Sequence, residues 1–202
     1  MTRRSLLTSL FVLIATASLA APPPVNPADA AAFMNQLWNR AVEEVLNNKA
    51  DPAVREARFR QLFHEDFDCP GTARFVLSRY WRNASKEQQE FVQLFEDYVV
   101  FVYTARLANF GGETFKIRGS RSDGDGVILS TDVISPGSAS PLRIDWRLVT
   151  DNSGYKINDV IVEGVSMMVT QRSEFASVVQ RNGGQLRGLI DLMREKTASA
   201  AH

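Results

Sequence analysis

His64 and Cys69 enclose three carboxylates, those of Glu65, Asp66 and Asp68, within one short stretch of the sequence. Such a cluster has the side chains for a metal site, or for a cysteine nucleophile activated by a histidine base. Only His64 could be that base, because the second histidine of the chain is its last residue. The run, however, crosses a predicted turn at the end of a helix, so its ligands do not aim at one point. We therefore interpret it as a surface loop with a small buried thiol.

Two further motifs offer chemistry that the surrounding residues do not complete. Ser166, within Gly-Val-Ser-Met-Met at 164–168, lacks the second glycine of a nucleophile elbow and has no separate histidine to serve it. Its hydroxyl is expected to cap the helix that follows. The loop Asp-Gly-Asp-Gly at 123–126 has two acids of a calcium loop, but neither the third acid nor the closing glutamate. This loop therefore predicts a turn.

The composition and charge exclude several classes of protein. The chain has 202 residues, and its 23 Lys+Arg balance 23 Asp+Glu, so it lacks the basic excess that nucleic-acid binding requires. Its single cysteine excludes an internal disulfide and a multi-cysteine zinc site. The 45% hydrophobic and 23% charged residues are typical of one globular domain with a sizeable core. We expect neither catalysis nor a bound metal or cofactor.

Residues 1–20 have the pattern of an export signal. Arg3 and Arg4 provide a positive start, an apolar stretch follows over 6–17, and Ser18 and Ala20 within Ser-Leu-Ala at 18–20 are the small residues that fit a peptidase site. The pattern fits a Sec or a twin-arginine signal, and its apolar stretch is too short to span a bilayer as a helix. We expect removal of 1–20, a linker over 21–26, and a soluble periplasmic protein with 21 basic against 23 acidic residues.

Capping signals divide the remaining chain into helices. Asn26-Pro27 and Asp51-Pro52 each place a capping side chain before a proline at the first helical position, and Pro70 opens a third helix. A capping box at 85–88 begins a long amphipathic helix, which Gly111-Gly112 ends. The first part of the chain is therefore predicted to be a helical lobe.

The periodicity changes from that of a helix to two between residues 113 and 163. Apolar and polar residues alternate there in four stretches joined by short turns, a pattern typical of an antiparallel meander with one apolar face. Two more helices are predicted over 167–196, followed by a flexible tail over 197–202. A helical lobe over 27–110, a sheet over 113–163 and C-terminal helices form one domain over 27–196. This order predicts an α+β architecture.

Several segments of the chain resemble those of one protein family. Ala-Arg-Phe-Val-Leu-Ser-Arg-Tyr-Trp-Arg stands at 73–82, Ala-Ser followed by Glu-Gln-Gln at 84–89, and Lys-Ile-Asn-Asp-Val at 156–160. The most specific segments are Glu-Gly-Val-Ser-Met at 163–167 and Arg-Ser-Glu-Phe at 172–175. In this order they are similar to the MlaC phospholipid-shuttle proteins, also called the toluene-tolerance family.

One position departs from the family pattern, and three segments resemble one of its branches. Ser78 stands where the family usually has glycine, between Leu77 and the Tyr-Trp pair, which bears on local helix packing. The residues at 75–81, 145–147 and 164–167 are most similar to those of the branch named HpnM. That branch is associated with hopanoid lipids, so the resemblance implies either phospholipid or hopanoid as cargo.

The resemblance implies both a fold and a function. In the family, helices surround a curved antiparallel sheet of four to five strands, of NTF2-like/MlaC type, and enclose a deep apolar cavity for lipid tails. Family members are lipid carriers without catalytic residues. They shuttle phospholipid between an outer-membrane lipoprotein complex and an inner-membrane MCE-type ABC transporter complex. For this chain we expect that cargo and those partners, no nucleic acid, and a monomer.

The alternatives differ in cargo or in class. A carrier of hopanoid or another isoprenoid lipid belongs to the same class and differs in the shape of its cavity. A periplasmic interaction or assembly factor that binds no lipid belongs to another class, and it predicts a filled core without a continuous cavity.

Apolar faces of the predicted elements supply the candidate lipid-binding residues. Such faces form a core more often than a pocket, so their assignment to a cavity follows from the resemblance. From the helices we expect Tyr80, Leu94, Phe95, Tyr98, Val99 and Val102. From the sheet we expect Phe115, Leu129, Val133, Ile144, Trp146 and Leu148, and from the closing segments Val162, Met168 and Val179.

Overall fold

The computed structural model describes residues 26–46, 51–83, 87–107 and 110–198. The expected signal, nearly all of the expected linker, Ser85 of the expected capping box and most of the expected tail lie outside the described residues. Within the described ranges, no helix is long and apolar enough to cross a membrane.

The first helices begin where their capping residues predict. In α1 (Pro27–Glu44), the Asn26 side chain accepts a hydrogen bond from the backbone N–H of Ala28 at 3.1 Å. In α2 (Pro52–Asp66), the Asp51 carboxylate accepts one from Ala53 at 2.8 Å. The third helix, α3 (Cys69–Leu77), begins at Cys69, one residue before the predicted proline. It is followed by the 3-10 helix η1 (Ser78–Asn83) and the long α4 (Gln88–Leu107).

Two helices follow the sheet, as predicted. Ser166 caps α5 (Met167–Arg181), because its Oγ accepts a hydrogen bond from the backbone N–H of Val169 at 3.0 Å. The last helix, α6 (Arg187–Ala198), extends through Ala198. Residues 197–198 are therefore helical, although the sequence assigned them to the tail.

The sheet is an antiparallel meander in the order β1-β2-β3-β4-β5. Its strands are β1 (Thr114–Asp123), β2 (Gly126–Ile134), β3 (Leu142–Asp151), β4 (Gly154–Val162) and the two-residue β5 (Val165–Ser166). The loop at 123–126 is the tight turn between β1 and β2. The predicted α+β class, with four to five antiparallel strands, is confirmed.

Two β-bulges bend the sheet and keep its apolar side chains on one face. One leaves Arg118 unpaired between Ile117 and Gly119, and the other leaves Asn158 unpaired opposite the step from Arg147 to Leu148. An extra residue on one strand increases local twist and curvature. The inner face consequently continues across all four long strands, and helices pack against it.

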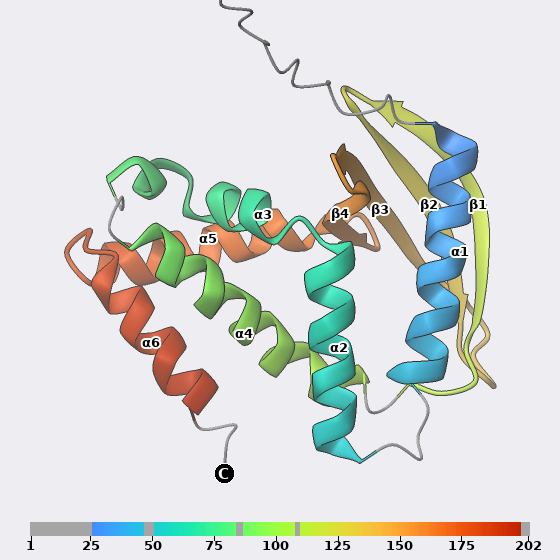
Figure 1. The fold of residues 1–202 in the computed structure, drawn as a ribbon, viewed down its shortest axis with the longest axis horizontal. Helices are drawn as coiled ribbons and strands as arrows, with labels where there is room; N and C mark the ends of the chain where they lie inside the picture. The colour runs from blue at the N-terminus through green and yellow to red at the C-terminus, as the bar shows by residue number, and fades with distance from the viewer. Residues whose placement is uncertain (1–25, 47–50, 84–86, 108–109, 199–202) are drawn as a thin grey trace, which may run out of the picture.

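The apolar residues form two separate clusters. One joins α1 to the inner face of the sheet, and its members include Leu129, Leu148 and Ile157. The other lies among α3–α6 and includes Phe91 and Phe175, whose rings meet edge to face at 5.9 Å. Figure 1 shows that α1 and the sheet form one half of the molecule and that α3–α6 form the other half. Helix α2 lies between the two halves. The two halves therefore meet along a seam near α2.

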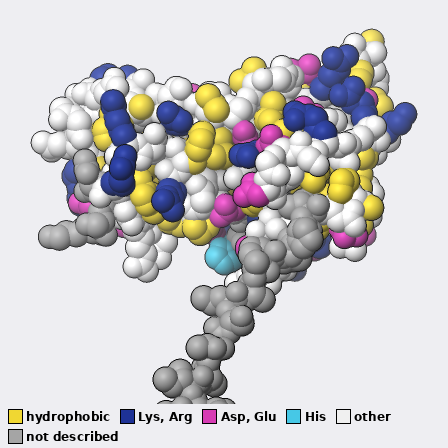
Figure 2. All heavy atoms as spheres, turned by 90° about the horizontal axis from the view of Figure 1, so that it is seen from above, with side chains coloured by type: hydrophobic (Ala, Val, Ile, Leu, Met, Phe, Trp, Pro, Cys, Tyr) yellow, Lys and Arg dark blue, Asp and Glu magenta, His cyan; other side chains and the backbone are white. Residues whose placement is uncertain are grey.

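Charged side chains of both signs cover the surface. Figure 2 shows Lys and Arg in two groups on one face, with Asp and Glu mostly between them. Several pairs bridge separate elements, including Arg147 with Asp123 at 2.6 Å and Arg118 with Asp132 at 3.3 Å on the outer side of the sheet. The equal numbers of acidic and basic residues in the sequence thus meet in local ion pairs on the surface.

Ser78 has a backbone conformation that favours glycine. Its φ of 50° and ψ of −120° place it in the region of the first central residue of a type II′ turn. This residue joins α3 to η1, and it is the position where the resembling family usually has glycine. A side chain at such a backbone conformation costs about 1–3 kcal/mol.

The Ser78→Gly variant is expected to be more stable than the natural chain. Glycine relieves the strain but makes the unfolded chain more flexible, so we expect a net gain of about 1 kcal/mol in the free energy of unfolding. Urea unfolding followed by circular dichroism measures it. Ser177→Gly, on the exposed face of α5, is the matched control and should lose about 0.5–1 kcal/mol. An unchanged or lower midpoint for Ser78→Gly would contradict the strain assignment.

Candidate binding cavity

A cavity of about 410 Å³ lies at the seam between the two apolar clusters. This volume falls in the range of about 300–1,000 Å³ that is typical of small-molecule sites. Its walls come from α1–α4, from the inner face of β2–β4, and from the start of α5. The side chains around it are mostly aliphatic or aromatic, so the cavity suits an apolar ligand.

The first two helices supply much of the wall. In α1, Leu37, Trp38 and Ala41 line the cavity, and the Trp38 ring also stacks on Phe115 of β1 with centroids 4.8 Å apart. In α2, Phe59, Leu62 and Phe63 line it. The stacking on Phe115 fixes α1 against the sheet, while the neighbouring turns of the same helix face the cavity.

One stripe of α4 forms the facing wall. Phe95, Val99 and Tyr103 line the cavity at four-residue intervals, which places them on one side of a helix. Arg106 and Leu107 continue this side towards the end of the helix. The neighbouring stripe, which includes Tyr98, turns towards Phe175 in the helical cluster, with ring centroids 5.9 Å apart.

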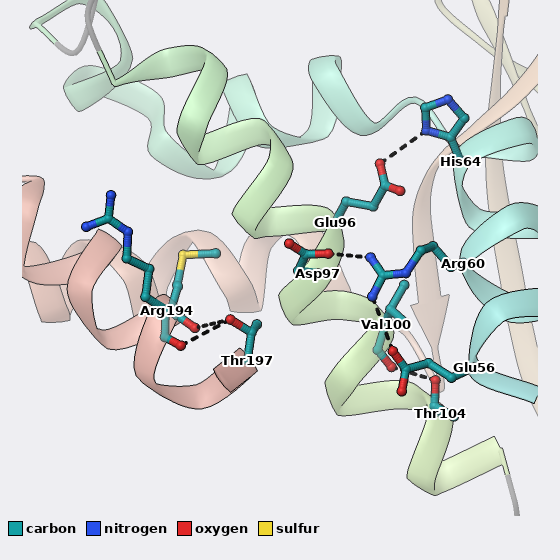
Figure 3. Close-up of polar contacts among 10 residues, drawn as sticks. Glu56, Arg60, His64, Glu96, Asp97, Val100, Thr104, Arg194 and Thr197 are labelled. Atoms are coloured by element: carbon teal, nitrogen blue, oxygen red, sulfur yellow. Dashed lines mark hydrogen bonds and ion pairs between the residues drawn. The ribbon is translucent and has the colours of Figure 1, made fainter. Parts of the chain in front are cut away.

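Ion pairs hold α2 and α4 together. Arg60 of α2 pairs with Asp97 of α4 and, at 3.3 Å, with Glu56 of its own helix. His64 Nδ1 lies 3.2 Å from the Glu96 carboxylate. Figure 3 shows these contacts bridging the two helices, whose other residues line the cavity. Since these pairs are largely exposed, each contributes modestly, about 0–1 kcal/mol.

The wall formed by the sheet contains a satisfied polar network. The Trp146 indole Nε1–H donates to Thr131 Oγ1 at 2.9 Å, and that hydroxyl donates to the carbonyl of Ile144 at 2.9 Å. Trp146 and Ile144 both line the cavity, whereas Thr131 is fully buried. The hydrogen bonds therefore satisfy the polar atoms behind an apolar wall.

A few polar side chains also reach the cavity, and most have partners. Asp159 accepts hydrogen bonds from Ser166 Oγ at 2.6 Å and from the backbone N–H of Met168 at 3.1 Å. Tyr103 Oη lies 3.8 Å from Met167 Sδ, which joins α4 to α5. Asn158 Oδ1, on the β4 bulge, is buried without a hydrogen-bond partner among the described residues.

A second hollow, of about 500 Å³, lies beside α1 and is lined in part by Phe33, Arg40 and Asp66. The Arg40 guanidinium donates to Glu65 at 3.0 Å and also to Asp66. Burial raises the pKa of Asp66, and the positive charge of Arg40 opposes that rise. Because these charges pair with one another, this hollow offers no unpartnered ionic group to a ligand.

Seven of the fifteen predicted lipid-binding residues line the cavity. They come from five elements, α4, β2, β3, β4 and α5, and the structure brings them together: Phe95, Val99, Val133, Ile144, Trp146, Val162 and Met168. Their contact with lipid stays a prediction. The other eight lie outside the lining: Tyr80, Leu94, Tyr98, Val102, Phe115, Leu129, Leu148 and Val179.

The eight residues outside the lining lie in three kinds of surroundings. Phe115, Leu129 and Leu148 belong to the inner face, but α1 covers them as part of the sheet cluster. Tyr80, Leu94, Tyr98 and Val179 pack in or against the helical cluster. Val102, on α4, is half-buried, one residue before Tyr103 on the lining stripe. An apolar pattern identifies these inward faces, but it does not separate covered positions from the lining.

Helices α1 and α2 also line the cavity, although none of the predicted lipid-binding residues lies in them. Phe33, Leu37, Ala41 and Val45 recur every four residues in the sequence, and the last three of them line the cavity, whereas Phe33 borders the second hollow. In the second helix, Phe59 and Leu62 stand three residues apart and also line the cavity. Their spacing was a sufficient signal for an inward face. The faces across which two helices meet the sheet depend on packing, which no local pattern specifies.

His64 and Cys69, the candidate base and nucleophile in the sequence, do not form a catalytic pair. Cys69 is 5% exposed within the helical cluster, whereas His64 is exposed and bonds to Glu96. Burial raises the pKa of the Cys69 thiol to about 12, with the Glu96 and Asp68 carboxylates adding to the rise. A thiol with this pKa is protonated at neutral pH and is a poor nucleophile. In the part of the chain that the structure describes, no group of three or more His, Cys, Asp or Glu could hold a metal ion.

Cys69 is expected to resist alkylation in the folded protein. Burial blocks access and leaves little thiolate, so iodoacetamide at about pH 8 should react at least about a hundredfold more slowly than in urea. Mass spectrometry of the intact chain over time measures both rates. Equal rates in the folded and unfolded protein would mean that the thiol is accessible.

The comparisons with known proteins agree with this geometry. Residues 32–195 match the family described as "MlaC protein". A segment of 113 residues is 23% identical to the intermembrane phospholipid transport system binding protein MlaC of Haemophilus influenzae, and covers 54% of this chain and 53% of that one. A segment of 155 residues is 25% identical to the toluene tolerance protein ttg2D of Pseudomonas putida, and covers 75% and 72%.

A solved structure has the same fold. The phospholipid-binding protein from Ralstonia solanacearum, solved in complex with a phospholipid, superposes with a TM-score of 0.67 and is 25% identical, over 83% of this chain and 98% of that one. Because the family match extends over most of the sequence, this chain belongs to the MlaC family. The aligned segment spans only about half the length of the Haemophilus relative.

Proposed function

We propose that this protein is a lipid carrier that holds the acyl tails of a phospholipid in the cavity at the seam. The cavity of about 410 Å³, lined from both apolar clusters, is the observation that carries the proposal. Membership of the MlaC family and the phospholipid in the related Ralstonia structure support it. A filled core, as an assembly factor would have, is less compatible with such a space.

Transfer of lipid between membranes explains the need for a carrier. Two acyl tails contain about thirty methylenes, and each costs about 0.8 kcal/mol in water, so unassisted crossing faces a barrier on the order of 20 kcal/mol. A cavity replaces bilayer hydrocarbon with protein hydrocarbon, which makes transfer nearly neutral and reversible. Direction must therefore come from the donor and the acceptor.

The family and the sequence support a proposal for the location and the partners. The carrier would be exported by the signal at 1–20 and act as a monomer in the periplasm. It would receive and deliver lipid at an outer-membrane lipoprotein complex and an inner-membrane MCE-type ABC transporter complex. A hopanoid is the alternative cargo, and the resemblance to the HpnM branch favours it. The reaction involves no covalent chemistry, so the proposal assigns no catalytic residue.

Mass spectrometry of lipid extracted from the purified protein tests the cargo. We expect about one phospholipid per chain, and a hopanoid in its place would identify the alternative cargo. A variant with a carboxylate in the cavity, Val99→Glu, should retain at least about tenfold less lipid because a charge is costly in apolar surroundings. Val169→Glu is the matched control, since Val169 is 53% exposed on α5 and does not line the cavity.

A second variant changes the space without changing the charge. Ala41→Phe places a ring where α1 lines the cavity and should reduce lipid retention while the chain stays folded. Circular dichroism melts of each variant separate loss of lipid from loss of structure. Normal retention by both folded Val99→Glu and folded Ala41→Phe would reject the cavity as the lipid site.

A further inference from the structure

Arg106 is the only basic residue that lines the cavity among the described residues. It lies in the last turn of α4 and is exposed to solvent, although its neighbours Tyr103 and Leu107 are partly buried. A residue that both borders the cavity and meets solvent lies at an opening. The opening beside the end of α4 therefore carries a positive charge.

The Arg106 side chain is held by a contact with an aromatic ring, and its positive charge has no ion-pair partner among the described residues. Its guanidinium lies over the Tyr103 ring, with Cζ 5.2 Å from the ring centroid. A cation–π contact of this kind leaves guanidinium N–H groups available to an acceptor. Most arginines at the α2–α4 and sheet surfaces pair with carboxylates, but no carboxylate among the described residues forms an ion pair with Arg106.

The other polar groups of the lining are less suited to an anion. Asp159 is the lining carboxylate, and both of its oxygens accept hydrogen bonds at the start of α5. The Gln171 amide donates to Glu174 at 3.3 Å. Asn158 Oδ1 is an acceptor, which an anion does not satisfy. Among the described residues that line the cavity, Arg106 is therefore the one whose donors carry a positive charge.

We infer that Arg106 binds the phosphate of the lipid head group at the cavity opening, so that the protein selects anionic phospholipids over uncharged lipids with the same tails. The guanidinium fork matches two phosphate oxygens, and such charge-assisted pairs are stronger than neutral hydrogen bonds. This inference rests on the proposed function, because it assigns the head group of a lipid whose tails fill the cavity. It also favours phospholipid over hopanoid as cargo.

Two lipids that differ only in the phosphate test the inference. Dioleoyl phosphatidic acid and dioleoylglycerol compete with a fluorescent apolar probe for the full-length chain, and their apparent Kd values are compared. Arg106→Ala should weaken binding of the phosphatidic acid about tenfold, the loss expected for one hydrogen bond to a charged group. It should leave dioleoylglycerol within about twofold. Arg106→Lys should keep part of the preference, because the charge remains without the fork.

Matched controls separate a head-group role from a general loss of charge or of structure. Arg181→Ala removes an exposed arginine at the far end of α5, outside the cavity lining, and should leave both affinities unchanged. Calorimetry with inorganic phosphate alone tests for a site that takes the free anion, and no binding is expected. Phosphate binding that disappears in Arg106→Ala would overturn the head-group assignment in favour of the free ion.

Failure of the inference differs from failure of the proposed function. Unchanged phosphatidic acid affinity in Arg106→Ala, with normal binding by the natural chain, overturns the role of Arg106 alone. Equal weakening of both lipids also overturns it, because Arg106 would then shape the opening instead of recognising charge. If the natural chain binds neither lipid, the carrier function and the inference fail together.

Discussion

Two apolar clusters face each other across a seam that the chain does not fill, and the rest of the structure depends on this constraint. Protein interiors normally pack as densely as organic crystals, so side chains along an open seam lose part of their dispersion contacts. Each half must therefore be stable by its own packing. The sheet half contains Leu129 and Leu148, both 0% exposed, and the helical half contains the aromatic group around Phe175.

The polar groups around the seam are arranged so that few of them face the cavity unsatisfied. The hydroxyl of Thr131, which is fully buried, accepts a hydrogen bond from the indole N–H of Trp146. Ser166 caps α5 and also donates a hydrogen bond to Asp159. These bonds satisfy polar groups beside the cavity that would otherwise need water as a partner. A motif that resembles part of a nucleophile elbow in the sequence is, in the fold, a helix cap that finishes this wall.

Much of the fold could be predicted from the sequence because its signals are local. Asn26, Asp51 and Ser166 cap the helices that they precede, and alternation identifies the four long strands. The lining could be predicted only in part. Periodicity identifies inward faces such as that of α4, but it assigns Leu129 and Val133 of the same strand face equally, and only Val133 borders the cavity. The difference arises because α1 covers one end of the sheet, which is a matter of tertiary packing.

Asn26, the first described residue, is held against the sheet by two hydrogen bonds. The Asn26 backbone N–H donates to Tyr155 Oη at 2.7 Å, and the same hydroxyl donates to the Asn26 carbonyl at 3.0 Å. Tyr155 stands on β4, so α1 is tied to the sheet at its first turn. Whatever precedes Asn26 is therefore attached at an anchored point. A purification tag or fluorescent protein fused upstream of Asn26 should therefore leave α1, which lines the cavity, in place, because the hydrogen bonds with Tyr155 hold the start of this helix.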